Sequence, residues 1–265
     1  MFAMPLFPIV GKRFTAAQFV DYAAHVPLGD WKPDLIVLHN TAVPTLKQRP
    51  TGFSESSMED LRQYYGEVQD WNGGPHLFVD QNGVWVFNPL DRRGTHSPSW
   101  NARSWGVEML GDYATEPFDS GDGLRVQGNA IGALAALFRR LGLPPTDEHF
   151  KLHKEDPKTT HVCPGKHVDK AKVRAAVQAL LTPAPAGLGI PAKIVVYRRN
   201  GGQNPSAALD GVLRSGSIFA DAEELSHATD IPTDEQGEIP LRTFVATRYR
   251  ITWKPETHRV YLVEL

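Results

Sequence analysis

The N-terminal two thirds of the chain alternates short apolar runs with polar turns. DLIVLHN, residues 34–40, is apolar on both faces, which is typical of a buried central strand, and this strand ends at His39. HLFVDQNGVWVFNP, residues 76–89, predicts two strands, because the Asn-Gly pair between them is a strong hairpin signal. SWGVEML, residues 104–110, predicts a further strand.

Three segments of the same region have a helical pattern. They are SSMEDLRQYYGEVQDW (56–71), NAIGALAALFRRLGL (129–143) and HVDKAKVRAAVQALL (167–181). The second is amphipathic and is expected to stop at Gly142 and Pro144. Strands interspersed with helices predict an α/β fold, in which a mixed central β-sheet is flanked by helices.

A change of composition at LLTPAPAGLGIPAK, residues 180–193, indicates a domain boundary. Three prolines and two glycines in this stretch are expected to end the preceding helix and form a semi-rigid linker. We therefore expect a domain over residues 1–182, a linker over 183–191 and a second domain over 192–265.

The second domain has a different pattern, which predicts a small α+β fold. Its candidate strands are KIVVYRR (193–199), FVATRYRITW (244–253) and RVYLVEL (259–265), and its candidate helix is ADAEELSHA (220–228). IPLRTF and ITWKPETHRVYL faintly resemble the copper-amine-oxidase N-terminal-like modules of bacterial surface proteins, without implying copper. A wall-binding role is expected, with dimerisation or simple packing as alternatives.

Composition excludes several classes of function. With 41% hydrophobic residues, 22% charged residues and a net charge of -2, the chain has no general attraction for nucleic acid or anionic membranes. No apolar run reaches the ~18–20 residues of a membrane span. The opening MFAMPLFPIVGKRF has no positive region before its apolar residues, so we expect an ordered arm rather than a signal peptide. The oligomeric state is left open.

Candidate metal ligands gather in KLHKEDPKTTHVCPGKH, residues 151–167, which contains three of the ten histidines and the only cysteine. Pro157 and Pro164 would break any helix that carried both His153 and Cys163. We therefore expect a folded-back loop to present these two residues. With His39 they make three ligand-type residues, the number that a catalytic zinc site uses. The alternatives are a hydrogen-bonded surface histidine and a small buried cysteine.

DLIVLHNTA, NARSWGVEMLGDY and H-x9-C-P-G occur in an order that resembles zinc-dependent N-acetylmuramoyl-L-alanine amidases. This fold group includes amidase-type phage lysozymes, anhydromuropeptide amidases and peptidoglycan recognition proteins, and the resemblance covers residues 30–180. It implies that His39, His153 and Cys163 bind Zn²⁺. Some members have Asp at the third position, and receptors without catalysis often lack a ligand there, so Cys163 favours an enzyme.

The resemblance also implies catalytic roles for two residues. Glu108 alternates away from its neighbours Val107 and Met109, and the family often has Glu here to activate the attacking water; the alternative is a carboxylate paired with an arginine. His161 occupies a position where the closest amidases have Lys, which supplies positive charge to the oxyanion. A histidine there leaves the charge at neutral pH open.

Substrate-binding residues are expected in GTHSPSWNARS, residues 94–104. His96 and Asn101 match positions that line the family's substrate groove, although a loop histidine and a turn asparagine are the simpler alternatives. Trp100 is the best candidate for an exposed aromatic side chain that grips the glycan or the peptide.

The implied reaction is hydrolysis of the amide bond between N-acetylmuramic acid and L-alanine of the stem peptide. Zinc would polarise the carbonyl and acidify water, Glu108 would transfer the proton, and zinc with His161 would stabilise the oxyanion. A cysteine hydrolase is a weaker alternative, because the zinc site already accounts for Cys163. A wall-cleaving domain without a leader suggests a phage or prophage endolysin. The rivals are a cytosolic recycling amidase for muropeptides and a non-catalytic peptidoglycan-binding protein.

Overall fold

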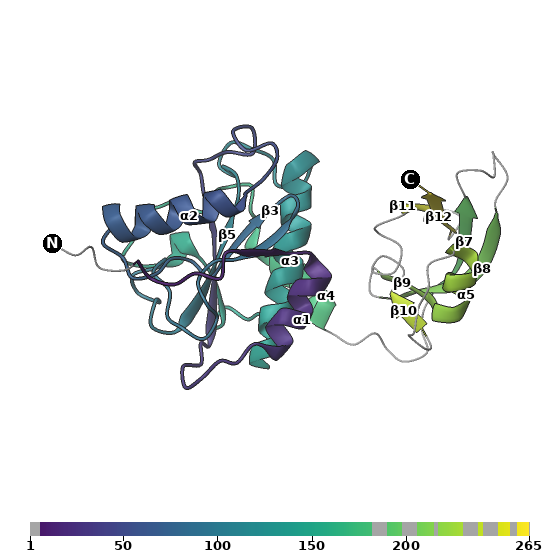
Figure 1. Cartoon of the computed structure of the whole chain (residues 1–265), viewed down its shortest axis with the longest axis horizontal. Helices are drawn as coiled ribbons and strands as arrows, with labels where there is room; N and C mark the ends of the chain where they lie inside the picture. The colour runs from purple at the N-terminus through teal and green to yellow at the C-terminus, as the bar shows by residue number, and fades with distance from the viewer. Residues whose placement is uncertain are drawn as a thin grey trace. The chain divides into compact units, whose positions relative to one another are not determined.

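A computed structural model of the chain divides it into two compact units, Met1–Leu181 and Thr182–Leu265 (Figure 1). The structure describes residues 6–181, 190–197, 206–214, 217–229, 238–240, 249–254 and 259–264. Each unit has a hydrophobic core of its own.

A six-stranded mixed sheet forms the centre of the first unit, with the strand order β1-β4-β3-β5-β2-β6. The strands are β1 (Lys12–Phe14), β2 (Leu35–Asn40), β3 (Leu77–Asp80), β4 (Gly83–Val86), β5 (Ser104–Met109) and β6 (Phe150–Leu152). β4 is antiparallel to both of its neighbours, β1 and β3, whereas β3, β5, β2 and β6 run parallel. The predicted strands and the predicted α/β fold class are confirmed.

Four α-helices accompany this sheet in the described residues: α1 (Ala16–His25), α2 (Glu55–Gln63), α3 (Gly121–Leu141) and α4 (Lys170–Leu181). α3 packs against β3, β4 and β5, and both α1 and α4 pack against α3 (Figure 1). Bulky side chains such as Trp105, Phe138 and Phe150 are fully buried in this core. No helix among the described residues is long and apolar enough to cross a membrane.

Several details of the first unit differ from the sequence prediction, and β1 and β6 were not predicted. α3 begins at Gly121, eight residues before the predicted start at Asn129, because its first turns contain glycines that hide the helical pattern. α2 ends earlier than expected and continues as a π-helical turn, Tyr64–Val68. α1 was not predicted, although Thr15 and Gln18 form a capping box, a signal that is readable from the sequence.

Residues 6–14 of the N-terminal arm lie along the first sheet and its core. The backbone N–H groups of Val10 and Gly11 donate to the carbonyl oxygens of Phe87 and Val86, and β1 then continues this pairing along β4. The apolar side chains of the arm pack against the core. Residues 1–5 of the predicted arm lie outside the described residues.

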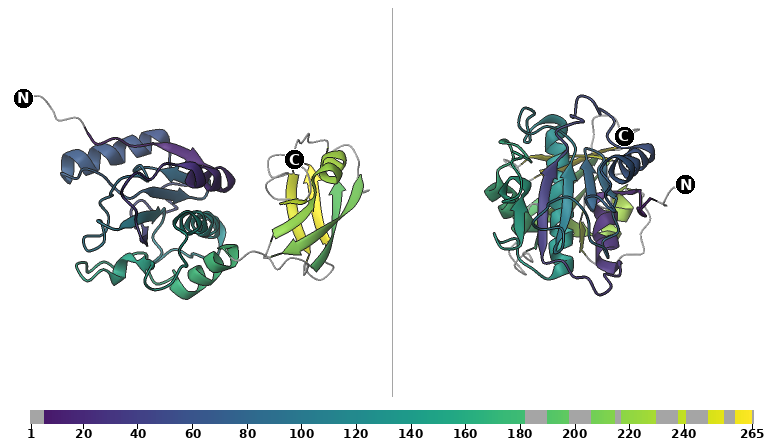
Figure 2. Two further views of the ribbon diagram at one scale, coloured as in Figure 1. Left: turned by 90° about the horizontal axis from the view of Figure 1, so that it is seen from below. Right: turned by 90° about the vertical axis from the view of Figure 1, so that its left-hand side faces the viewer.

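The second unit contains another six-stranded sheet, with the order β10-β9-β8-β7-β12-β11. Its elements are β7 (Ile190–Tyr197), β8 (Ala207–Arg214), β9 (Ser217–Asp221), α5 (Ala222–Thr229), β10 (Glu238–Pro240), β11 (Tyr249–Lys254) and β12 (Arg259–Glu264). α5 packs against β8 and β9 (Figure 2). β12 and β7 are parallel, and the other pairs are antiparallel.

The α+β character predicted for this unit agrees with these elements. β7 begins at Ile190, so the last two residues assigned to the linker belong to a strand. Residues 183–189 of the predicted linker and residues 244–248 of the predicted strand lie outside the described residues. β8, β9 and β10 were not predicted from the sequence.

Candidate active site

The parallel strands at the centre of the first sheet bring three predicted site residues to one edge. His39 lies near the carboxyl end of β2, and Glu108 is its direct neighbour on β5. On the other side of β2, β6 ends at Leu152, and a 3-10 turn, His153–Glu155, follows at once. Because parallel strands end at the same edge, residues far apart in sequence meet there.

The three predicted ligands are close enough to bind one cation. One donor atom each from His39, His153 and Cys163 lies within 4.8 Å of the other two. Zinc bonds to nitrogen and sulfur measure about 2.0–2.3 Å, so ligands of one ion lie roughly 3.5 Å apart. Small side-chain movements would therefore complete a zinc site.

His153 provides an independent test of this fit. Its Nε2 atom is buried and has no hydrogen-bond partner among the described residues. A buried polar atom without a partner is costly, and most such atoms in native proteins are satisfied. A bound cation at this nitrogen would remove the cost, and two imidazoles with one thiolate are a donor set that zinc prefers.

The position of Cys163 is determined by backbone contacts on both sides of the loop. Its carbonyl oxygen accepts a hydrogen bond from the backbone N–H of Lys154 at 2.8 Å, and its Sγ accepts one from the N–H of Asn40 at 3.1 Å. Gly165 has φ +100°, and a Cβ there would collide with the backbone of Tyr113. The Pro-Gly pair after Cys163 therefore allows the loop to pass close to this neighbouring segment.

The environment of Cys163 argues against a nucleophilic thiol. Burial raises the pKa of Cys163, and the charge of Glu108 raises it further. Reactive cysteines have a lowered pKa and a nearby cation or histidine partner. The hydrogen bonds of the Sγ atom go to the backbone of Asn40 instead. Because no hydrogen bond joins this sulfur to a histidine among the described residues, the geometry does not favour the cysteine-hydrolase alternative.

Glu108 lines the same cavity and is only partly exposed. Burial raises the pKa of its carboxyl group to about 8. Among the described residues, no arginine or lysine forms an ion pair with it, so the structural ion pair considered from the sequence is not found. A carboxyl group that titrates near neutrality suits proton transfer.

His161 is exposed and also lines the cavity. Its ring lies nearly parallel to that of His153, with 5.5 Å between the ring centroids. His161 therefore lies beside His153, but it is not one of the three residues whose donor atoms converge.

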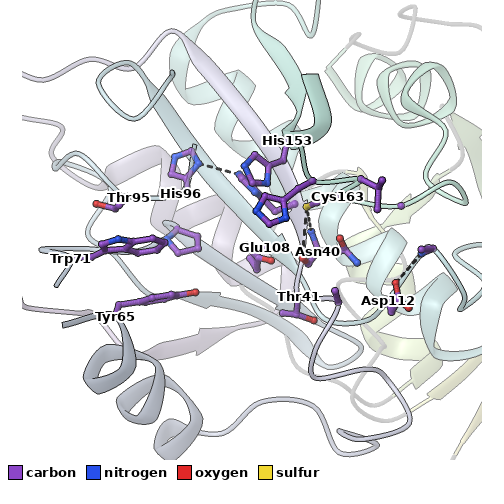
Figure 3. Close-up of a pocket in the computed structure, with 17 residues that line it drawn as sticks. Asn40, Thr41, Tyr65, Trp71, Thr95, His96, Glu108, Asp112, His153 and Cys163 are labelled. Atoms are coloured by element: carbon purple, nitrogen blue, oxygen red, sulfur yellow. Dashed lines mark hydrogen bonds between the residues drawn. The ribbon is translucent and has the colours of Figure 1, made fainter. Parts of the chain in front are cut away.

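The cavity has a volume of about 350 Å³ and includes residues that were not predicted. Tyr65 and Trp71 form a stacked pair with 5.1 Å between their ring centroids, and Figure 3 shows this pair across the cavity from Cys163. The π-helical turn places Tyr65 here, and helical periodicity alone does not signal such a turn. Further polar lining comes from Asn40, Thr41, Thr95 and Asp112.

The three residues expected to bind substrate differ in position. His96 lines the cavity, but its side chain is buried and forms a hydrogen bond with His39. Asn101 and Trp100 are not among the residues that line the cavity. The Oδ1 atom of Asn101 accepts hydrogen bonds from the backbone N–H groups of His96 and Ser97, so Asn101 shapes the loop.

Comparison with protein families identifies the family of the chain. The profile of the N-acetylmuramoyl-L-alanine amidase family matches residues 30–166, which is more than half of the chain. The chain belongs to this family. It is therefore a peptidoglycan amidase, and all candidate ligands named above lie within the matched residues. No curated protein matches the chain.

Several solved structures are similar to this amidase. The N-acetylmuramoyl-L-alanine amidase LysC from Clostridium intestinale URNW is 18% identical, with a TM-score of 0.44 over 66% of this chain and 93% of that chain. Drosophila PGRP-LB is 20% identical, with a TM-score of 0.42 over 55% and 84%. A selenomethionine derivative of AmpD is 21% identical, with a TM-score of 0.42 over 58% and 87%.

Asp156 connects the His153 turn of this amidase to the loop that carries His96. Its buried carboxylate accepts hydrogen bonds from the Ser97 hydroxyl and the Ser99 backbone N–H, and from the N–H of Lys158. Burial by itself would raise the pKa of Asp156, but these hydrogen bonds outweigh burial and lower it to about 2.

Asp156→Asn is expected to lower the free energy of unfolding at pH 7 by about 1–3 kcal/mol, because charged acceptors form the stronger hydrogen bonds. The stabilisation is present above the unfolded pKa of ~3.9 and is lost as the pH falls through the folded value. The gap between wild type and variant should therefore close between about pH 5 and pH 2 in urea titrations. Asp30→Asn, at an exposed turn, is the control; an equal loss there would contradict the assignment.

Proposed function

We propose that this amidase is zinc-dependent and that His39, His153 and Cys163 hold the metal. The observation that carries the proposal is the convergence of three donor atoms within 4.8 Å of one another. One belongs to His39 on β2, and the other two belong to His153 and Cys163, which follow β6. The unpartnered Nε2 of His153 supports the same assignment. A complete donor set also favours an enzyme over the non-catalytic binder considered from the sequence.

A bound zinc ion would supply a Lewis acid that polarises the amide carbonyl and acidifies water. The surrounding charges suit such an ion. Two neutral imidazoles and one thiolate would leave a single positive charge, and the carboxylate of Glu108 would balance it. A nearby cation favours the ionised forms of Cys163 and Glu108, which burial alone disfavours.

Glu108 is proposed as the general base and acid. Its carboxylate takes a proton from the attacking water and returns it to the leaving amine of L-alanine. Its place on β5, directly beside His39 on β2, supports this role, because it puts the carboxyl group next to the proposed metal site. General acid–base catalysis of this kind typically contributes ~10²–10⁴-fold in rate.

His161 is proposed to donate a hydrogen bond to the negative charge that develops on the carbonyl oxygen. Its position at the cavity, beside His153, supports this role. Tyr65 and Trp71 offer a flat aromatic wall, which suits packing against a sugar ring or the stem peptide. Trp100, proposed from the sequence, is a weaker candidate because it does not line this cavity.

We further propose that the substrate is the intact cell wall, as expected for an endolysin. The support is the second compact unit, which has its own sheet and core and contains none of the proposed site residues. Such a unit is available for holding the enzyme on an insoluble polymer. Mass analysis of products from purified sacculi tests the reaction: new L-alanine amino termini with intact N-acetylmuramic acid are expected.

The purified protein is expected to contain close to one zinc per chain by elemental analysis. Chelator treatment should abolish hydrolysis, and one equivalent of Zn²⁺ should restore it, because the metal supplies the Lewis acid. Cys163→Ser should lower the zinc content, whereas His25→Ala, at an exposed helix end, should leave it unchanged. Full activity in a zinc-free sample would overturn the proposal.

Glu108→Gln and His161→Ala are each expected to keep zinc and lower kcat by ~10²-fold or more, because neither side chain is a proposed ligand. His167→Ala is the matched control, since His167 belongs to the same loop and bonds to the backbone of Glu116 outside the cavity. If His161→Ala loses zinc while His153→Ala retains it, His161 and not His153 is the zinc ligand.

A chain truncated after Thr182 is expected to hydrolyse soluble muropeptides as fast as the full chain, because every proposed site residue precedes this point. Its binding to intact sacculi in a sedimentation assay should be weaker. Unchanged sacculus binding would show that the second unit is not a wall anchor and would favour the recycling amidase as the alternative.

A further inference from the structure

His96 is in direct contact with a proposed zinc ligand. Its Nδ1 atom lies 3.1 Å from the Nε2 atom of His39, and both rings are buried. The two rings are nearly perpendicular, with 5.1 Å between their centroids. One of these two nitrogens must carry the shared hydrogen, and the other must accept it.

Ser104 determines which nitrogen of His96 carries its hydrogen. The Ser104 hydroxyl donates to the carbonyl oxygen of Trp100 at 2.7 Å. That hydroxyl therefore has no hydrogen left for the His96 Nε2 atom, which lies 3.3 Å away. The carbonyl oxygen of Ser104, 3.4 Å from the same nitrogen, is an acceptor only. Both contacts require a hydrogen on Nε2 of His96.

A neutral imidazole has one N–H, so this arrangement leaves Nδ1 of His96 as an acceptor. His39 must then donate from its Nε2 atom. Consequently, the Nδ1 atom of His39 has the free lone pair, which is the form that a metal ligand needs.

We propose that His96 is a positioning residue that selects the tautomer of His39 and presents its Nδ1 atom to zinc. This inference rests on the proposed zinc site. It gives His96 a role different from the substrate contact expected from the sequence. Partners of this kind orient ligand histidines and raise their basicity.

The surroundings prevent the His96 ring from turning away. A Cβ atom on Gly106 would lie 2.6 Å from Cγ of His96, so the glycine of β5 lets the ring lie against the strand. The backbone N–H of His96 is bonded to Asn101 at 2.8 Å. The relay from Ser104 through His96 to His39 is thus held in place without any metal.

Nitrogen-15 NMR of the histidine side chains tests the assignment directly. In wild-type protein, both without metal and with one equivalent of Zn²⁺, the His39 ring should carry its hydrogen on Nε2. In the zinc form, Nδ1 of His39 should show the shift of a metal-bound nitrogen. A hydrogen on Nδ1, or zinc bound through Nε2, would overturn the proposal.

Zinc affinity tests the same relay through variants. His96→Leu removes the acceptor and should weaken Zn²⁺ binding by ~10–100-fold in competition with a chromophoric chelator. His96→Asn offers an amide oxygen near the place of Nδ1 and should recover most of the affinity. If Asn binds zinc no better than Leu, His96 acts only through packing and the proposal fails.

His149→Leu is the matched control. His149 is another largely buried histidine, whose Nδ1 atom bonds to the backbone carbonyl of Asp34 at 2.7 Å, and among the described residues no hydrogen bond or ring contact joins it to His39 or His96. This variant should lose stability but keep an affinity for Zn²⁺ close to that of wild type. Equal weakening in both variants would contradict the relay.

The outcomes separate this inference from the proposed function. Wild-type protein that binds no zinc would remove the zinc proposal itself. Zinc-dependent hydrolysis with unchanged affinity in His96→Leu would leave the proposed function intact and exclude the positioning role of His96.

Discussion

The parallel pairing of β2 with β5 on one side and β6 on the other is the constraint on which the site depends. This register makes His39 and Glu108 neighbours and ends β6 where the His153 turn begins. A shift by one residue in either pair would turn the side chains to the opposite face of the sheet. The buried apolar side chains of β2, fully covered on both faces, oppose such a shift.

Around this strand register, buried polar groups hold two loops in place. Asp156 and Asn101 each bond to more than one backbone or hydroxyl group of the loop that carries His96. Because unsatisfied buried polar groups are costly, such networks have few alternative arrangements. The loop that carries His96 and the turn that begins at His153 are therefore held in place without any ligand.

Burial favours the uncharged forms of the titratable groups around the cavity. Burial raises the pKa of both Cys163 and Glu108 and lowers the pKa of His96 to about 3 and that of His39 well below its usual range. The chain alone thus favours four uncharged groups. A divalent cation would reverse this preference for the thiol and the carboxyl group while it uses the neutral imidazoles as they are.

Local patterns in the sequence were sufficient for several elements of the first unit, but not for β1, α1, β6 or the π-helical turn. Apolar β2, the hairpin around Asn82-Gly83 and the amphipathic part of α3 follow from periodicity and turn chemistry, and the family resemblance supplied the ligand set. Tertiary structure alone decided that Trp100 lies outside the cavity, that Tyr65 and Trp71 line it, and that His96 bonds to His39. The reason is that these contacts join segments far apart in the chain: His39 and His96 are 57 residues apart, and Asn40 and Cys163 are 123 apart. Strand register and loop packing bring such residues together, and neither leaves a periodic signal in the sequence.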